Sequence, residues 1–154
     1  ALTVDPDDAE LDRIVAALSP DLLQLHGRET PQRCAAIRAR TGVGVMKALG
    51  VADSADLAVV PAYAAVCDRL LIDAKPPKGA ALPGGNGVAF DWRLLDGFAP
   101  GAPWLLSGGL TAENVGQALR LTRAPGVDVS SGVESAPGVK DVEKIRAFAR
   151  AARG

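Results

Sequence analysis

The chain has 154 residues, of which 48% are apolar and 23% are charged, so it can bury one hydrophobic core and is expected to form one domain. Its 17 Lys and Arg nearly balance 18 Asp and Glu, which argues against partners such as nucleic acid or an anionic membrane. Two cysteines and one histidine cannot supply a disulfide scaffold or a four-ligand zinc site; they favour a reducing, cytoplasmic setting. The length also argues against a complete barrel of eight βα units, which typically takes about 250 residues.

Short apolar runs alternate with segments of helical periodicity, and this pattern is typical of βα units around a parallel sheet. In the first third of the chain, strands are predicted at residues 1–4, 21–25 and 43–49. The helix between the first two begins near Asp5-Pro6 and carries apolar residues at helical spacing from 11 to 18. For the next helix, Thr30-Pro31 supplies an N-cap and a first-turn proline, and Gly42 supplies a left-handed end.

The same alternation continues to the end of the chain. A short helix capped by Asp53 or Ser54 is expected to kink or end at Pro61. The irregular segment 74–89 contains three prolines and a Gly-Gly-Asn-Gly run, which is typical of a functional or mobile loop. The remaining expected elements are strands at 69–72, 104–106 and 127–129, and helices at 90–95, from 111 and through 142–148, which makes six βα units in all.

Polar residues collect where the predicted strands end. In βα proteins the active site lies at the carboxyl ends of the strands, so these side chains are expected to surround one mouth. They are His26, Lys47, Asp73, Ser107, Asp128 and Ser130.

Two of these residues are carboxylic acids in apolar strands. Asp73 is a candidate general acid, with capping of the following loop as its alternative role. Asp128 either points into the mouth or pairs with a cation, because an unpaired charge within an apolar run is costly. His26 is a candidate substrate contact or a hydrogen-bonded structural residue. Lys47 could contact substrate, or could pair with Asp73 or Asp128 across the interior.

Two turns of small residues follow the last two predicted strands, Ser107-Gly108-Gly109 and Ser130-Ser131-Gly132. Their backbone N–H groups can approach an anion closely, so together they predict a split phosphate cradle. The alternative is that the glycines only permit tight turns. Cys34 and Cys67 are expected to be packing residues.

Five motifs in chain order resemble the phosphoribosylanthranilate isomerase family of tryptophan biosynthesis. The resemblance covers essentially the whole chain, and the last motif is nearly complete. The motifs are Leu23-Gln24-Leu25-His26-Gly27; Lys47-Ala48-Leu49-Gly50-Val51; Leu71-Ile72-Asp73-Ala74-Lys75-Pro76, with Gly84-Gly85-Asn86-Gly87 and Phe90-Asp91-Trp92; Leu106-Ser107-Gly108-Gly109-Leu110; and Val127-Asp128-Val129-Ser130-Ser131-Gly132-Val133-Glu134.

The resemblance implies an α/β fold of the TIM (β/α)8 barrel type. It also implies an Amadori rearrangement of N-(5-phosphoribosyl)anthranilate to 1-(2-carboxyphenylamino)-1-deoxyribulose 5-phosphate, without cofactor or metal. In that family the aspartate matching Asp73 is the general acid, and the aspartate matching Asp128 lies near the anthranilate end. The turns matching Gly108-Gly109 and Ser130-Ser131 hold the phosphate of the phosphoribosyl substrate.

By the family pattern, Ala1 to Pro6 is the third strand, so residues 1–154 would supply βα units three to eight of a barrel domain that is incomplete at its N-terminus. The family's base cysteine and carboxylate-binding arginine have no match here. We therefore expect a fragment, the renumbered part of a longer protein, or a short protein that completes its sheet by assembling with a partner or with itself. We expect a monomer or homodimer, and we expect the chain to be inactive alone. The alternatives are another phosphosugar barrel enzyme, such as an epimerase or indoleglycerol-phosphate synthase, and a non-catalytic phosphate-binding half-barrel.

Overall fold

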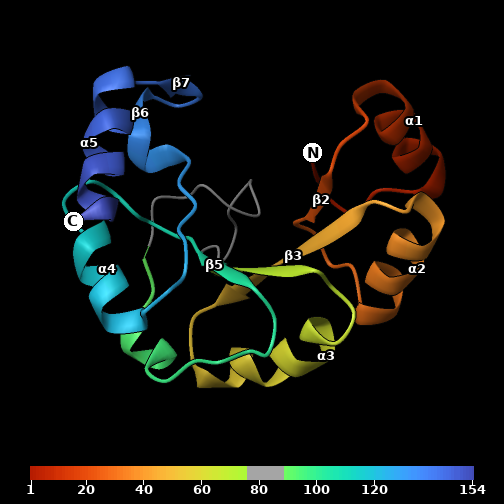
Figure 1. The fold of residues 1–154 in the computed structure, drawn as a ribbon, viewed down its shortest axis with the longest axis horizontal. Helices are drawn as coiled ribbons and strands as arrows, with labels where there is room; N and C mark the ends of the chain where they lie inside the picture. Colours follow the sequence, from red (N-terminus) through yellow and green to blue (C-terminus); the bar gives the residue numbers. More distant parts are fainter. Residues whose placement is uncertain (76–88) are drawn as a thin grey trace.

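A parallel sheet organises the chain. The computed structural model describes residues 1–75 and 89–154, and in these residues five parallel strands pair in chain order. Figure 1 shows the sheet curving, with the helices on its outer side. The strands are β1 (Leu2–Thr3), β2 (Leu22–Leu25), β3 (Gly44–Val51), β4 (Arg69–Ala74) and β5 (Trp104–Leu106).

The helices follow the strands as the sequence predicts. Thr30 accepts a hydrogen bond from the N–H of Arg33, and Gly42 ends that helix with φ +67°. Pro61 lies in the first turn of a short α-helix, where a preceding 3₁₀ segment changes to α geometry. The α-helices are α1 (Asp8–Leu18), α2 (Pro31–Thr41), α3 (Val60–Ala64), α4 (Val115–Thr122) and α5 (Val142–Arg153), and the 3₁₀ segments are η1 (Ser54–Val59), η2 (Trp92–Leu95) and η3 (Ser131–Val133).

The two faces of the sheet bury different sets of side chains. The large core lies between the sheet and the helices and includes Leu23, Val45 and Ile72. A smaller apolar cluster of Met46, Ala48 and Leu71 forms on the opposite, inner face. Because successive strand residues point to opposite faces, this division fixes the direction of every polar side chain on the strands.

Three local predictions are wrong. Residues 127–129 form only a single bridge, from Val127 to Leu106, instead of a strand. The helix expected from residue 111 begins at Val115, because the Asn114 side chain accepts from the N–H of Thr111 and donates to the carbonyl of Gly109, which closes a turn before the helix. The first helix begins at Asp8 with Asp7 as its N-cap, whereas Asp5 has a left-handed φ of +48°.

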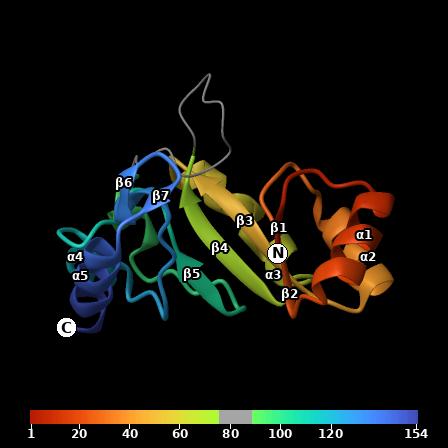
Figure 2. The same cartoon turned by 90° about the horizontal axis from the view of Figure 1, so that it is seen from above.

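The carboxyl ends of the strands share one edge of the sheet. Figure 2 shows the arrowheads of β3 and β4 pointing to the edge where the hairpin of β6 (Glu134–Ala136) and β7 (Val139–Lys140) lies. That hairpin was not predicted. Most of the predicted loop 74–89 falls on residues 76–88, outside the described part of the chain. No helix in the described residues is both long and apolar enough to cross a membrane.

Candidate active site at the carboxyl ends of the strands

The inner face of the sheet carries polar side chains at the ends of its strands. On β2, Leu23 and Leu25 belong to the outer core, so the alternate residues Gln24 and His26 lie on the inner side. On β4, Ile72 faces the outer core and Asp73 lies on the inner side. The alternation of strand residues thus brings side chains from different strands to one mouth.

His26 and Asp73 meet across β3. The Nε2 atom of His26 lies 3.3 Å from Oδ2 of Asp73, and their side chains are 12% and 9% exposed. The amide Nε2 of Gln24 lies 3.3 Å from His26 Nδ1, and the N–H of Ala74 donates to Asp73 Oδ1 at 2.8 Å. Each side chain of this pair therefore has a second contact that limits its orientation.

Asp128 supplies a second carboxyl group beside the first pair. The hydroxyl of Ser107 donates to Asp128 Oδ2 at 3.3 Å. Burial raises the pKa of Asp128; the Ser107 hydrogen bond opposes this, and the nearby charge of Asp73 raises the pKa further. These contacts place Asp128 near Asp73, and its role in substrate binding stays a prediction.

This arrangement suits proton transfer. A buried carboxyl group with an imidazole neighbour and a second carboxyl group of raised pKa can give a proton to a substrate oxygen and take one back. In the described residues, no group of three or more His, Cys, Asp and Glu side chains is placed to hold a metal ion.

The two predicted phosphate turns lie against one another and beside Asp73. Gly108 has a φ of +90°, and a Cβ atom there would meet the backbone N of Ala74 and come within 3.0 Å of Asp73 Oδ1. A Cβ atom on Gly132 would meet the carbonyl oxygen of Leu110. The absence of side chains at these positions therefore allows the turns to pack closely, and phosphate binding by Gly108, Gly109, Ser130, Ser131 and Gly132 stays a prediction.

The predicted pairing of Lys47 is wrong. Its ammonium lies 2.9 Å from Oε2 of Glu29, and it does not pair with Asp73 or Asp128. The reason is strand alternation: Lys47 shares the outer side of β3 with Val45 and Leu49, which belong to the core under the helices. Its role in substrate binding, which was also predicted, has no contact on the inner face to support it.

Sequence reasoning missed two members of this region. Gln24 could have been found from the alternation that places it beside His26. Glu29 carries no such signal, because it follows an exposed arginine and precedes a helix cap, yet only 4% of it is exposed. Lys75, next to the Asp73–Ala74 pair in sequence, has its ammonium 2.7 Å from Oδ1 of Asp56 on η1.

Comparison with known proteins identifies the family. The family model of N-(5'-phosphoribosyl)anthranilate (PRA) isomerase matches residues 1–151. The chain belongs to the PRA isomerase family. The family resemblance seen in the sequence motifs is thereby confirmed, and so is the prediction that the protein is an isomerase of tryptophan biosynthesis.

Relatives and solved structures agree with this assignment. The chain is 66% identical to the PRA isomerase of Paracoccus denitrificans, covering 96% of this chain and 68% of that protein. It is 66% identical to that of Azorhizobium caulinodans, covering 99% and 67%. A PRA isomerase structure from Thermotoga maritima superposes with a TM-score of 0.85 at 33% identity, over 99% of this chain and 71% of that one. Another, solved with reduced 1-(o-carboxyphenylamino)-1-deoxyribulose 5-phosphate, gives 0.82 at 31% identity, over 99% and 70%. The fold is therefore α/β and similar to a TIM barrel.

The expectation that the chain is inactive alone is wrong. Relatives that are 62–66% identical over 96–99% of the chain are named as PRA isomerases, and the family model extends over nearly all of it. The same findings remove the non-catalytic module and the other phosphosugar enzymes as alternatives.

Proposed function

We propose that the protein catalyses the rearrangement of N-(5'-phosphoribosyl)anthranilate to 1-(2-carboxyphenylamino)-1-deoxyribulose 5-phosphate, with Asp73 as the general acid. The observation that carries this proposal is the contact between Asp73 and His26 on the inner side of the sheet, at 3.3 Å, next to Asp128. Opening the furanose ring requires a proton on the ring oxygen, and a buried, oriented carboxyl group at the mouth can supply it.

The other side chains of the mouth bind the substrate in this proposal. His26 and Asp128 contact its anthranilate and ribose parts, and the N–H groups of the turns 108–109 and 130–132 bind its phosphate. The small side chains of these turns support this assignment, because a phosphate oxygen needs backbone N–H groups that it can approach closely. The rearrangement breaks the ring C–O bond and moves protons and a double bond within one molecule, with no net gain or loss of electrons, so these residues need no cofactor or metal.

We further propose that residues 1–154 form one domain whose βα units correspond to units three to eight of a (β/α)8 barrel. One continuous core that includes residues from α1 to α5 supports the single domain, and the order of the five motifs supports the numbering. The protein acts in the cytoplasm, as a monomer or homodimer. Its two buried, free cysteines, Cys34 and Cys67, fit a reducing compartment.

The test is Asp73→Asn, which keeps the shape and the acceptor for the Ala74 N–H but removes the acid. We expect kcat to fall by about 10²–10⁴-fold, the usual contribution of general acid–base catalysis, with little loss of stability. Product formation is measured by chromatography of the anthranilate compounds. Asp91→Asn is the matched control, because Asp91 is an exposed carboxylate paired with Arg93 on η2. An Asp73→Asn protein that retains wild-type kcat would remove Asp73 from the acid role.

A further inference from the structure

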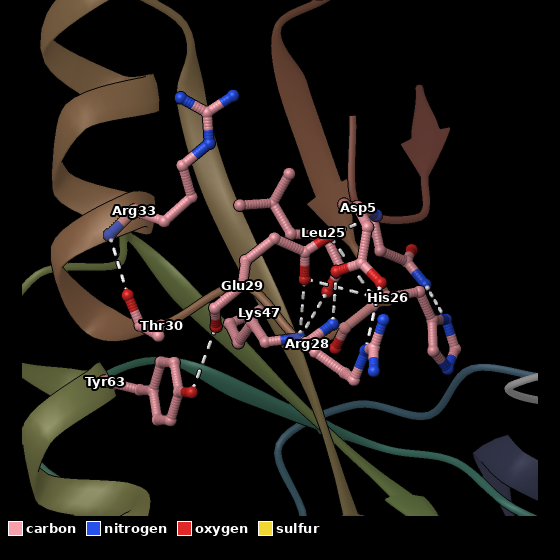
Figure 3. Close-up of polar contacts among 11 residues, drawn as sticks. Asp5, Leu25, His26, Arg28, Glu29, Thr30, Arg33, Lys47 and Tyr63 are labelled. Atoms are coloured by element: carbon pink, nitrogen blue, oxygen red, sulfur yellow. Dashed lines mark hydrogen bonds and ion pairs between the residues drawn. The ribbon is translucent and has the colours of Figure 1, made fainter. Parts of the chain in front are cut away.

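A buried ion pair lies on the outer side of the sheet, directly beside the segment that carries His26. The side chains of Lys47 and Glu29 are only 3% and 2% exposed, and their charged atoms lie 2.9 Å apart. Figure 3 shows Lys47 and Asp5, from two other parts of the chain, beside Glu29 and His26. Neither Lys47 nor Glu29 belongs to the inner face, so the proposed chemistry does not use them directly.

Lys47 holds the backbone on both sides of His26. Its ammonium donates to the carbonyl of Leu25 at 3.1 Å and to the carbonyl of Gly27 at 2.8 Å, and its third donor goes to Glu29. An ammonium has three N–H donors, so all of them act on residues 25–29. The 25–26 and 27–28 peptide groups, on either side of the His26–Gly27 peptide, are thereby fixed to β3.

Glu29 connects the same segment to two other parts of the fold. Its carboxylate accepts from the N–H of Gly27 at 3.0 Å and from the N–H of Asp5 at 2.8 Å. Its backbone carbonyl accepts from the hydroxyl of Tyr63, on α3, at 3.0 Å. The turn after β2 is therefore anchored to the turn after β1 and to the helix layer.

The two turns are also packed too closely to move independently. A Cβ atom on Gly27 would lie 2.6 Å from the backbone N of Asp5, and the N–H of Arg28 donates to Asp5 Oδ1 at 2.6 Å. Removing two charges from water is costly, and an apolar pair of similar volume is often as stable or more so. The stability of the fold is thus a poor explanation for a buried charge pair here. Holding the turn in a single conformation is a sufficient explanation.

We propose that Glu29 and Lys47 are positioning residues, which hold the turn after β2 so that the His26 imidazole faces Asp73 in the orientation required for the reaction. The inference rests on the proposed function, because Asp73 is its acid. The contact of 3.3 Å between His26 and Asp73 depends on where the backbone of residue 26 lies. A displacement of about 1 Å at a reacting group can lower the rate on the order of 10²-fold.

The primary test is the double variant Glu29→Gln with Lys47→Met, which removes both charges together and leaves no buried charge unpaired. We expect kcat to fall between about 10- and 100-fold while KM changes less than about threefold. The matched control is Glu143→Gln with Arg146→Met, which removes an exposed pair on α5 and should leave kcat unchanged. Ile37→Val, on the buried side of α2, controls for loss of stability alone.

A spectroscopic measurement reports the position of His26 without relying on activity. His26 is the single histidine of the 154 residues, so its imidazole NMR signals are assigned by their loss in His26→Gln. We expect these signals to shift or broaden in the double variant and to stay in place in both controls. Tyr63→Phe removes one anchor with little risk of unfolding, and it should shift the same signals by a smaller amount.

The outcomes separate this inference from the proposed function. If Asp73→Asn keeps full activity, the acid role fails, while the imidazole signals still show whether Glu29 and Lys47 position His26. If the imidazole signals of Tyr63→Phe and of the folded double variant coincide with those of the wild type, and kcat is unchanged, the positioning role is overturned. If the double variant does not fold, coincident signals in Tyr63→Phe overturn it.

Discussion

Gly108→Ala tests whether the turn after β5 must lack a side chain. A Cβ atom there would meet the backbone N of Ala74, lie 2.7 Å from Ala74 Cβ and lie 3.0 Å from Asp73 Oδ1. The first contact involves backbone, which cannot rotate away as the end of a flexible side chain can. Either the turn or the end of β4 must therefore move.

The expected cost has two parts. The φ of +90° at Gly108 is a left-handed conformation, which costs a residue with a Cβ roughly 1–2 kcal/mol. Forcing an extra methyl group into a packed site typically costs a further 1–3 kcal/mol. The free energy of unfolding should therefore fall by about 2–5 kcal/mol.

Gly101→Ala separates these two parts. Gly101 has a φ of +80°, but a Cβ atom there would have open space around it. This control should show the conformational cost alone, about 1–2 kcal/mol. Equilibrium unfolding in urea measures both variants, and their difference gives the cost of the contacts with Ala74 and Asp73. If Gly108→Ala is no more destabilised than Gly101→Ala, the close packing of this turn against β4 is refuted.

Two further predictions concern stability. Burial raises the pKa of Asp128, with the charge of Asp73 adding to it and the Ser107 hydrogen bond opposing it, so ionised Asp128 costs stability. The wild type loses this stability as the pH rises from about 4 through the raised pKa of Asp128. Asp128→Asn should therefore become more stable relative to the wild type between pH 3 and pH 7, as measured by urea titrations. A stability difference that does not change with pH would contradict this. Thr30→Ala removes the hydrogen bond from the Arg33 N–H at 3.2 Å and should lower the free energy of unfolding by about 1 kcal/mol. Thermal unfolding measures this loss, with Thr111→Ala as the control. Equal Tm values for Thr30→Ala and the wild type would show that the cap contributes nothing.

The strands and caps could be predicted because their signals are local. The runs 21–25 and 69–72 became β2 and β4 within one or two residues, and the Thr30 cap formed as expected. The run 127–129 failed because a strand needs a partner ladder, and only one bridge, to Leu106, forms in the described residues. Pairing of this kind depends on residues distant in sequence.

The candidate site was likewise predicted only in part. His26, Asp73 and Asp128 were found because strand ends converge, and the structure places these three side chains near one another. Lys47 was assigned to the wrong face because its type was considered without the alternation of its strand. Glu29 could not be found, since its burial comes from contacts with Lys47 and Asp5, 18 and 24 residues away.

The separation of charges between the two faces of the sheet has a chemical consequence. Had Lys47 pointed inward, its ammonium would have lain near the carboxyl groups of the mouth and favoured their ionised forms. Its outward direction and its pairing with Glu29 keep that cation away from Asp128, whose pKa is raised mainly by burial. The same lysine can therefore hold the turn that carries His26 without lowering the pKa of Asp128. The outer side of β3 thus carries the charges that hold the turn of His26, while the pKa of Asp128 on the inner side is set mainly by burial.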